Sequence, residues 1–101
     1  MRREEDIIRW GEARNLIGPT GQATKIGQFC KTLEEVAELS SAITDRDEAA
    51  VKDAIGDIIV TLVMQASMWG LLIDECVEAA YQQIKDRKGK MVNGVFVKEE
   101  V

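Results

Sequence analysis

The 101-residue sequence contains no histidine, and this absence narrows the chemistry open to the protein. Without histidine there is no imidazole general base, no Ser–His or Cys–His nucleophile pair, and no histidine ligand for a metal ion. Any chemistry therefore rests on carboxylates, on lysine or arginine, on hydroxyl groups, or on a metal ion held by oxygen atoms.

The sequence also lacks a net positive charge and has few aromatic side chains. The formal net charge is −5 at pH 7, and Phe, Trp and Tyr together make up 5% of the residues. Proteins that bind nucleic-acid polymers need an excess of positive charge along the phosphates, or an aromatic surface on which bases stack. We therefore expect no nucleic-acid polymer among the partners of this chain.

The sequence has two cysteines, Cys30 and Cys76, which are too few for a zinc site. Their apolar neighbours predict buried free thiols, and free thiols favour a cytoplasmic location. The first ten residues lack the apolar segment of a signal peptide. Residues 54–73 are largely apolar, but Asp57 and Gln65 within them favour a buried helix over a membrane span.

Proline occurs once and glycine eight times, in a sequence rich in helix-forming residues. This composition predicts an all-α domain over residues 1–101, a small four-helix bundle. The apolar residues of its third helix point in nearly every direction, so we expect the bundle to pair into an oligomer. The first helix is expected over about residues 3–15 and the second over about 22–43. The third is expected to end near Trp69, and the fourth near Lys88.

Local signals predict the ends of these elements. The third helix is capped either by Asp45, which forms a capping box with Glu48, or by Asp47. Asp74 is expected to cap the fourth helix. Residues 91–97 hold an Asn-Gly pair between β-branched residues, which predicts a short β-hairpin or an extended arm.

The second expected helix has one apolar stripe at helical spacing. Its members are Ile26, Phe29, Cys30, Leu33, Val36, Ala37, Ser40 and Ile43. If this stripe packs inward, Glu34 and Glu38 lie on its flank and Glu35 lies further round the helix. Two or three carboxylates then converge one helical turn apart.

The third expected helix combines an apolar composition with a polar stripe at steps of four, formed by Asp53, Asp57, Thr61 and Gln65. Burying a carboxylate is costly unless something pairs with it. If this helix packs antiparallel to the second, its two aspartates face the glutamates there. Like charges about 4 Å apart repel by about 4 kcal/mol at an effective dielectric of 20, so such a cluster needs a cation.

With only oxygen ligands available, the fitting ions are Mg²⁺, Mn²⁺ or Ca²⁺. Two structural interpretations compete with a metal site. The glutamates also suit a solvated helix face, and acids near a helix N-terminus also suit the helix dipole.

Positive charge is concentrated where the fourth helix ends, at Lys85, Arg87, Lys88 and Lys90. These cations either stabilise the helix C-terminus or clamp the outer phosphates of a nucleotide. Lys25 and Lys31, on the second helix, are further candidates for a phosphate contact.

The pattern Glu35-x-x-Glu38, followed after a spacer by Gly56-Asp57 on a second apolar helix, resembles the MazG-like all-α nucleoside triphosphate pyrophosphohydrolases. The motif of that family is ExxE, a spacer of about a dozen or more residues, and ExxD. The resemblance extends over about residues 24–98. The sequence departs from the motif at Ala54, where the family has the second Glu.

The resemblance implies an enzyme that uses Mg²⁺, with Mn²⁺ as the alternative, and cleaves (deoxy)nucleoside triphosphates to the monophosphate and pyrophosphate. Such enzymes form homodimers or homotetramers and remove unwanted nucleotides. Glu35, Glu38 and Asp57 would bind metal, and Asp53 is the candidate fourth ligand.

Other roles implied by the resemblance are proton acceptance and substrate contact. Glu34 or Asp53 would take the proton from the attacking water. The substrate contacts would come from Lys31, Lys85, Arg87, Lys88 and Trp10. Trp10 and Phe29 are both candidates to stack on a base, with core packing as the alternative for each.

The competing function is a non-catalytic helical module for oligomerisation or regulation, in which the acids form a solvated face. Within the same fold family, the phosphoribosyl-ATP pyrophosphatases are a further possibility that nothing in the sequence favours.

Overall fold

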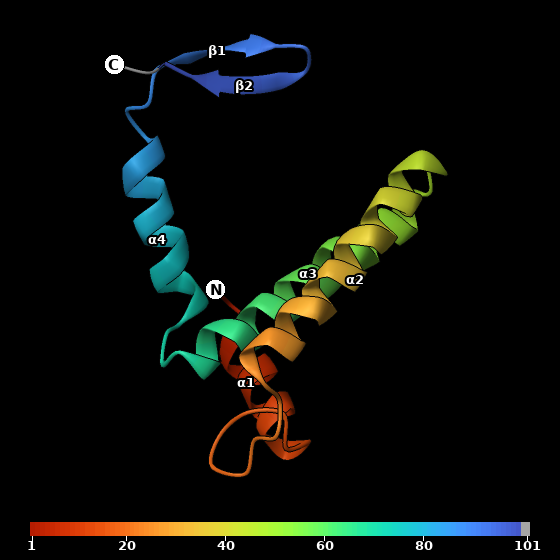
Figure 1. Cartoon of the computed structure of the whole chain (residues 1–101), viewed down its shortest axis with the longest axis vertical. Coiled ribbons are helices and arrows are strands. Elements are labelled where there is room, and N and C mark those ends of the chain that lie inside the picture. Colours follow the sequence, from red (N-terminus) through yellow and green to blue (C-terminus); the bar gives the residue numbers. More distant parts are fainter. Residues whose placement is uncertain (100–101) are drawn as a thin grey trace.

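The computed structural model describes residues 1–99 and contains four helices followed by a two-stranded antiparallel sheet (Figure 1). In chain order the elements are α1 (Glu4–Ala13), α2 (Lys25–Thr44), α3 (Glu48–Met68), α4 (Ile73–Ile84), β1 (Gly89–Val92) and β2 (Val95–Lys98). The predicted helical class with a C-terminal hairpin is confirmed. Residues 100 and 101, the last two of the expected domain, lie outside the described part of the chain.

The helices α2 and α3 lie side by side and antiparallel, and they form the centre of the fold (Figure 1). Hydrogen bonds at two positions of the polar stripe of α3, Thr61 and Gln65, connect α2 to α3. Gln28 Nε2 on α2 donates to the Thr61 carbonyl at 3.3 Å, and Gln65 Nε2 donates to the Lys25 carbonyl at 3.0 Å. Buried polar groups need such partners. The pairing places the middle of α2, around Glu35, opposite the first half of α3.

Side-chain caps begin the two central helices. Thr24 accepts a hydrogen bond from the backbone of Gly27 at 3.0 Å at the start of α2. Asp47, rather than Asp45, accepts one from Ala50 at 3.1 Å and begins α3. The expected Asp74 cap of α4 is wrong. Leu72 occupies that position, and its backbone N–H donates to Glu75 at 3.0 Å.

The first helix packs across α3 through a close approach at Gly11. Gly11 is buried, and a Cβ atom at this position would lie 2.6 Å from the Met64 sulfur and 3.2 Å from Ile17 Cγ1. Met64 is itself only 1% exposed, so it has little room to move aside. A glycine here therefore allows α1 to approach α3.

Replacing Gly11 with alanine is expected to destabilise the fold by about 1–3 kcal/mol, because the added methyl overpacks the contact with Met64. Gly56→Ala is the matched control, since a Cβ at Gly56 meets nothing within 4 Å. That change is expected to stabilise helix α3 by about 0.5–1 kcal/mol. Urea unfolding at one fixed protein concentration measures both. Shifts of the same sign would contradict the proposed packing role of Gly11.

The α4 helix and the hairpin extend away from the other three helices as an arm, defined here as residues 71–99 (Figure 1). Gly70 adopts a positive φ of 71° after α3, and α4 then turns by 100° relative to α3. The hairpin turn has positive φ at Asn93 and Gly94, as the Asn-Gly pair predicts. No residue from 71 to 99 is buried.

Contacts with Met1 and Glu4 fix the start of α4, where the arm begins. Glu4 is 5% exposed, and its carboxylate oxygens accept from the Ile73 backbone N–H at 2.8 and 3.1 Å. The Met1 amino group forms an ion pair with Asp74. The first turn of α4 is therefore fixed against α1.

The apolar stripe of α2 does not pack inward as the sequence predicts. The side of α2 that faces α3 contains the buried residues Gln28, Glu35 and Ala42. The stripe residues Ile26, Phe29, Leu33, Val36 and Ile43 are instead 46–69% exposed. Cys30 and Cys76 are also exposed, contrary to expectation.

The core of one chain is consequently small. Its buried apolar residues are Ile17, Ala42, Ala54, Val63, Met64 and Ala66. Within residues 1–99, no single helix is long and apolar enough to cross a membrane. Helices α3 and α4 satisfy that test only as a pair bent by 100°.

Candidate metal centre

Three carboxylates converge where the middle of α2 meets the first half of α3. Glu35 and Glu38 lie one turn apart on α2, and Asp57 lies opposite them on α3. One oxygen from each of the three residues lies within 4.8 Å of the others. Three like charges at this separation repel strongly unless a cation lies between them.

The environment of Glu35 supports a cation at this cluster. Glu35 is 8% exposed, and its Oε2 is a buried side-chain oxygen without a hydrogen-bond partner in residues 1–99. A buried carboxylate oxygen without a partner is costly, and a metal ion is one way to satisfy it. Because all the donors are carboxylate oxygens, the residues fit a hard divalent ion such as Mg²⁺, Mn²⁺ or Ca²⁺.

Lys31 adjoins the cluster on the solvent side. Its Nζ lies 3.3 Å from Glu34 and 3.6 Å from Glu35. The hydrogen bond and charge of Glu34, followed by the charge of Glu35, raise the pKa of Lys31 above its usual value. Glu34 is thus paired with Lys31 and is not one of the converging residues.

Asp53 lies on α3 one turn before Asp57, and it is not part of the cluster of three. It is exposed and lines a groove that also reaches Asp57. Ala54, at the position of the missing motif glutamate, is 4% exposed and packs as part of the core. The cluster of three therefore has no carboxylate from position 54.

A groove between α1 and α3 leads away from Asp57. Two pockets of about 510 and 800 Å³ share Arg3, Ile7, Asp57 and Val60, so they form parts of one groove. Trp10 lines the smaller part and is 45% exposed. The Arg14 guanidinium lies 4.5 Å from the Trp10 ring centre and covers part of it. Each part has a volume in the range of small-molecule sites.

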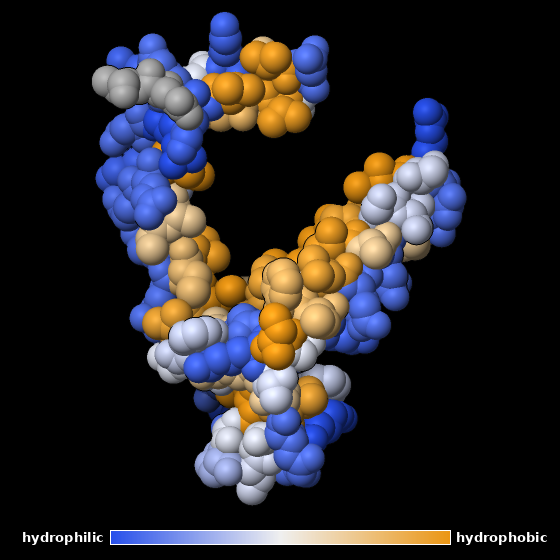
Figure 2. Space-filling model, in the orientation of Figure 1, coloured by the Kyte–Doolittle hydropathy of each residue, from blue (hydrophilic) through white to orange (hydrophobic). Residues whose placement is uncertain are grey.

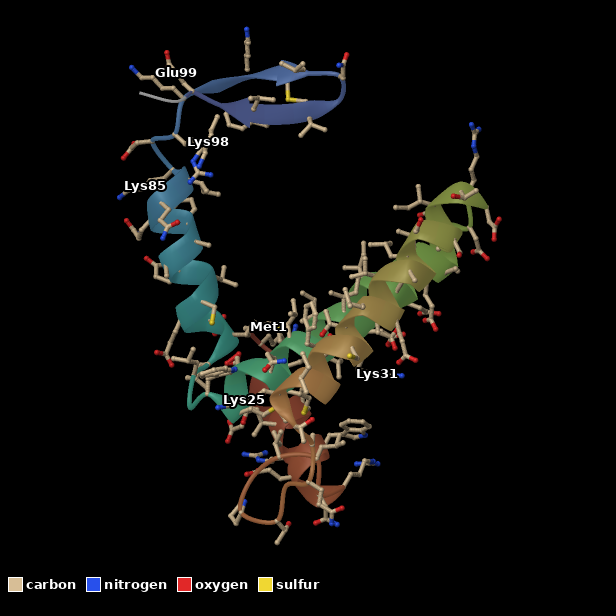
Figure 3. The ribbon with its side chains drawn as sticks, viewed as in Figure 1. Met1, Lys25, Lys31, Lys85, Lys98 and Glu99 are labelled. Carbon is tan, nitrogen blue, oxygen red and sulfur yellow. The ribbon has the colours of Figure 1, made fainter. Side chains whose placement is uncertain are left out.

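The predicted substrate contacts are divided between two places. Lys31 and Trp10 lie near the acidic cluster and its groove, whereas Lys85, Arg87 and Lys88 lie at the end of α4. In Figure 3, Lys31 projects from α2 and Lys85 from the arm, far apart in one chain. One copy therefore does not bring the arm cations to its own acids.

Three cations at the groove were missed by sequence reasoning, namely Arg2, Arg3 and Lys52. Arg2 and Arg3 stand before α1, and nothing local indicates that they lie beside α3. Lys52 directly precedes Asp53, and that adjacency was the available signal.

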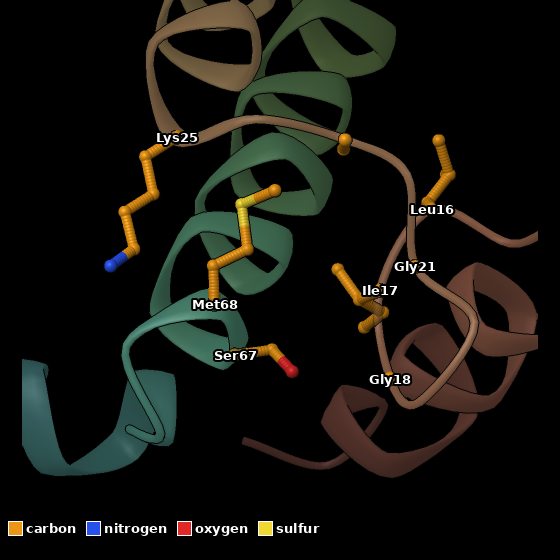
Figure 4. Close-up of a pocket in the computed structure, with 8 residues that line it drawn as sticks. Leu16, Ile17, Gly18, Gly21, Lys25, Ser67 and Met68 are labelled. Atoms are coloured by element: carbon orange, nitrogen blue, oxygen red, sulfur yellow. The ribbon is translucent and has the colours of Figure 1, made fainter.

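A separate pocket of about 350 Å³ lies at the other end of the α2–α3 pair (Figure 4). Lys25 and Ser67 are its polar side chains, beside Leu16, Ile17 and Met68. The Lys25 ammonium lies 3.7 Å from the Trp69 ring centre. This pocket contains no carboxylate, so it is distinct from the candidate metal centre.

A known protein family matches more than half of the chain. The model of the MazG nucleotide pyrophosphohydrolase domain matches residues 28–92 of the chain. The chain belongs to this family. The MazG match includes Glu35, Glu38 and Asp57 and extends through α4 into the hairpin, whereas α1 with Trp10 lies outside it.

One curated relative is an uncharacterized 18.2 kDa protein in the rep-hol intergenic region of Haemophilus phage HP1 (strain HP1c1). It is 37% identical over 62 residues, which are 61% of this chain. The match covers 36% of the relative, so this MazG chain spans about a third of that protein's length. No solved structure matches the chain.

Proposed function

We propose that this MazG domain hydrolyses nucleoside or deoxynucleoside triphosphates to the monophosphate and pyrophosphate, with Mg²⁺ as the metal and Mn²⁺ as a substitute. The observation that carries the proposal is the convergence of Glu35, Glu38 and Asp57, with a buried oxygen of Glu35 lacking a partner. Removal of unwanted nucleotides is the corresponding biological role.

The proposed mechanism needs no protein nucleophile. A divalent ion held by Glu35, Glu38 and Asp57 would offset phosphate charge and lower the pKa of a water. Asp53 is exposed on the same side of α3 as Asp57, and we assign it a role in holding or accepting the proton of that water. Glu34 is the alternative proton acceptor, although its ion pair with Lys31 makes it less available.

The groove supports a position for the remainder of the nucleotide. Arg2, Arg3 and Lys52 offer positive charge beside Asp57, and these cations would offset charge on the phosphates. Trp10 presents an exposed aromatic face in the same groove, where a base can stack. In this arrangement Lys85, Arg87 and Lys88 would reach a substrate only on another copy of an oligomer.

A nucleotide panel tests the function. The purified chain is incubated with each common NTP and dNTP plus Mg²⁺, and monophosphate, pyrophosphate and inorganic phosphate are quantified. Equal amounts of monophosphate and pyrophosphate are expected, with activity lost on chelation and restored by Mg²⁺ or Mn²⁺. If the folded protein turns over no nucleotide, the non-catalytic oligomerisation module becomes the better explanation.

Trp10→Ala is expected to raise KM for the preferred nucleotide about tenfold with little change in kcat, since base stacking contributes about 1–3 kcal/mol. Trp69→Ala is the matched control, because Trp69 is 60% exposed but does not line the groove. Steady-state kinetics of both variants measures the effect. Equal KM changes in the two variants would remove Trp10 from the substrate site.

A further inference from the structure

The helix α1 presents one side to the groove beside Asp57. The side chains that line the smaller part of the groove from this helix and the residue before it are Arg3, Asp6, Ile7 and Trp10. Each of them lies three or four positions from two of the others, so they share one face of the helix. The groove therefore receives a defined set of side chains from a helix that lies before the residues matched to the family.

The two parts of the groove differ in charge. The larger part contains Arg2 and Lys52, and its side chains have a net positive charge. The smaller part contains the Asp6 carboxylate and the Trp10 ring, and its net charge is negative. Phosphates are attracted to the cations and repelled by Asp6. A nucleotide in the groove would therefore have its base in the smaller part, with its phosphates directed to the larger part and the metal centre.

One face of the Trp10 ring is already covered within the chain. The Arg14 guanidinium lies 4.5 Å from the ring centre, and its Nη1 donates to the Trp10 carbonyl at 3.1 Å. Arg14 lines neither part of the groove. The open side of the ring therefore faces the groove, where Asp6 lies one helical turn before Trp10. A base that stacks on this side has its edge near Asp6.

The surroundings of Trp10 favour recognition of a base by its edge. The end of the molecule that contains α1, at the bottom of Figure 2, is largely polar, whereas apolar side chains gather on the two limbs above it. Among the large apolar side chains of α1, Trp10 is the one that is exposed, at 45%. An aromatic surface with a few polar groups beside it suits a ligand with a flat ring and a polar edge.

The Asp6 carboxylate retains acceptor positions for such an edge. Its side chain is 55% exposed, and Oδ2 accepts from Arg3 Nη1 at 3.0 Å. Arg9 Nη1 lies 3.9 Å from Oδ1, which is beyond hydrogen-bond distance. A carboxylate has about four acceptor positions and no donor, so the bond from Arg3 leaves the others available. The two guanidinium groups hold the carboxylate beside the groove.

We propose that Asp6 selects nucleotides whose base has an amino group, guanine above all, and disfavours uracil and thymine. This inference rests on the proposed nucleotide hydrolysis. Guanine offers N1–H and its 2-amino group as neighbouring donors, which match the two oxygens of one carboxylate, and Arg3 is a donor for guanine O6. Cytosine and adenine offer one amino group each. Uracil and thymine place one N–H between two carbonyl oxygens, which an acceptor-only group repels.

Two matched pairs of triphosphates test the preference of the wild-type chain. dITP is dGTP without the 2-amino group, and dUTP has a carbonyl where dCTP has an amino group. Initial rates with Mg²⁺ give kcat/KM for each nucleotide. We expect dGTP to exceed dITP, and dCTP to exceed dUTP, by about tenfold or more, because a site that accepts from a donor discriminates against the analogue that lacks it. A ratio near one, or an inverted ratio, in either pair would overturn the proposal.

Asp6→Asn tests whether this residue is responsible. The isosteric amide offers both a donor and an acceptor, which suit the carbonyl and N–H of uracil. We expect the preference for dCTP over dUTP to disappear or to reverse. Glu5→Gln is the matched control, because Glu5 is the adjacent exposed acid, pairs with Arg9 and lines neither part of the groove. Equal shifts in the two variants, or no shift in Asp6→Asn, would contradict the role of Asp6.

Binding of monophosphates separates this inference from the proposed hydrolysis. Equilibrium dialysis of dGMP, dIMP, dCMP and dUMP with the wild-type chain involves no chemical step, and the same order of affinities is expected. If no triphosphate is hydrolysed but this order is found and is lost in Asp6→Asn, the proposed function fails and base selection stands. If triphosphates are hydrolysed without discrimination, base selection fails alone. Absence of both hydrolysis and binding would overturn both.

Discussion

Glu38→Gln and Asp57→Asn are each expected to lower turnover by about a thousandfold, because each removes a charge that would hold and balance the metal ion. Loss of about 4 kcal/mol of transition-state stabilisation corresponds to this factor, and metal ions contribute on that scale. The substitutions are isosteric, so the helices should remain folded. Initial rates at saturating nucleotide and a series of Mg²⁺ concentrations provide the measurement.

Asp53→Asn is the matched control for this prediction. Asp53 shares the groove with Asp57 but lies outside the cluster of three carboxylates. We expect Asp53→Asn to weaken Mg²⁺ affinity by about 10–100-fold, as outer partners of metal ligands do. High Mg²⁺ should restore metal binding, but not the part of kcat that depends on Asp53 as a proton acceptor. A wild-type Mg²⁺ dependence would show that Asp53 has no part in the site. A loss of Mg²⁺ binding at all Mg²⁺ concentrations would instead make Asp53 a direct ligand.

Glu35→Gln is expected to change stability in opposite directions with and without metal. In the metal-free protein Glu35 has a buried oxygen without a partner, and a neutral amide removes the charge that burial penalises. We expect a gain of about 1–2 kcal/mol, which corresponds to a rise in Tm of roughly 5–10 °C. The stabilisation that Mg²⁺ gives the wild-type chain should disappear in the variant.

Thermal unfolding at one protein concentration, with and without Mg²⁺, measures both parts of this prediction. Glu34→Gln makes the same chemical change at the neighbouring residue, which is exposed and paired with Lys31. It should leave both the metal-free Tm and the response to Mg²⁺ close to wild type. A lower metal-free Tm for Glu35→Gln would mean that the Glu35 carboxylate stabilises the fold without metal.

The MazG assignment and the structure each contribute a different part of the site. The family match begins at residue 28, so it covers the acids of α2 and α3 but not α1. The groove that contains Trp10 and Arg3 exists because α1 packs across α3. Nucleotide preference is therefore expected to depend on α1, which lies before the residues that match the family.

Local chemistry in the sequence was sufficient to predict the helices and the hairpin. The Asp47 cap and the Asn93-Gly94 turn act within three or four residues, so their effects can be read without knowing the fold. The spacing of Glu35 and Glu38 is equally local. The further assumption that the partner helix is antiparallel brought Asp57 beside them, whereas the assumption that the apolar stripe packs inward was wrong.

The sequence could not determine which face of α2 is buried within one chain. Helical periodicity identified the apolar stripe that includes Leu33 and Val36, but the face containing Gln28 and Glu35 is the one that packs on α3. Periodicity marks a surface that avoids water, and it does not say whether the same chain or another covers it. The buried state of Glu35 was missed for the same reason.

Long-range packing also decided what surrounds the acids. The sequence alone determined that this is a helical chain with oxygen ligands at helical spacing and cations near its C-terminal end. The close approach of Gly11 to Met64, which sets the groove, and the turn after Gly70, which sends the arm away, depend on the tertiary structure. Such contacts join residues far apart in the chain, and no local pattern encodes which distant surface a residue will meet.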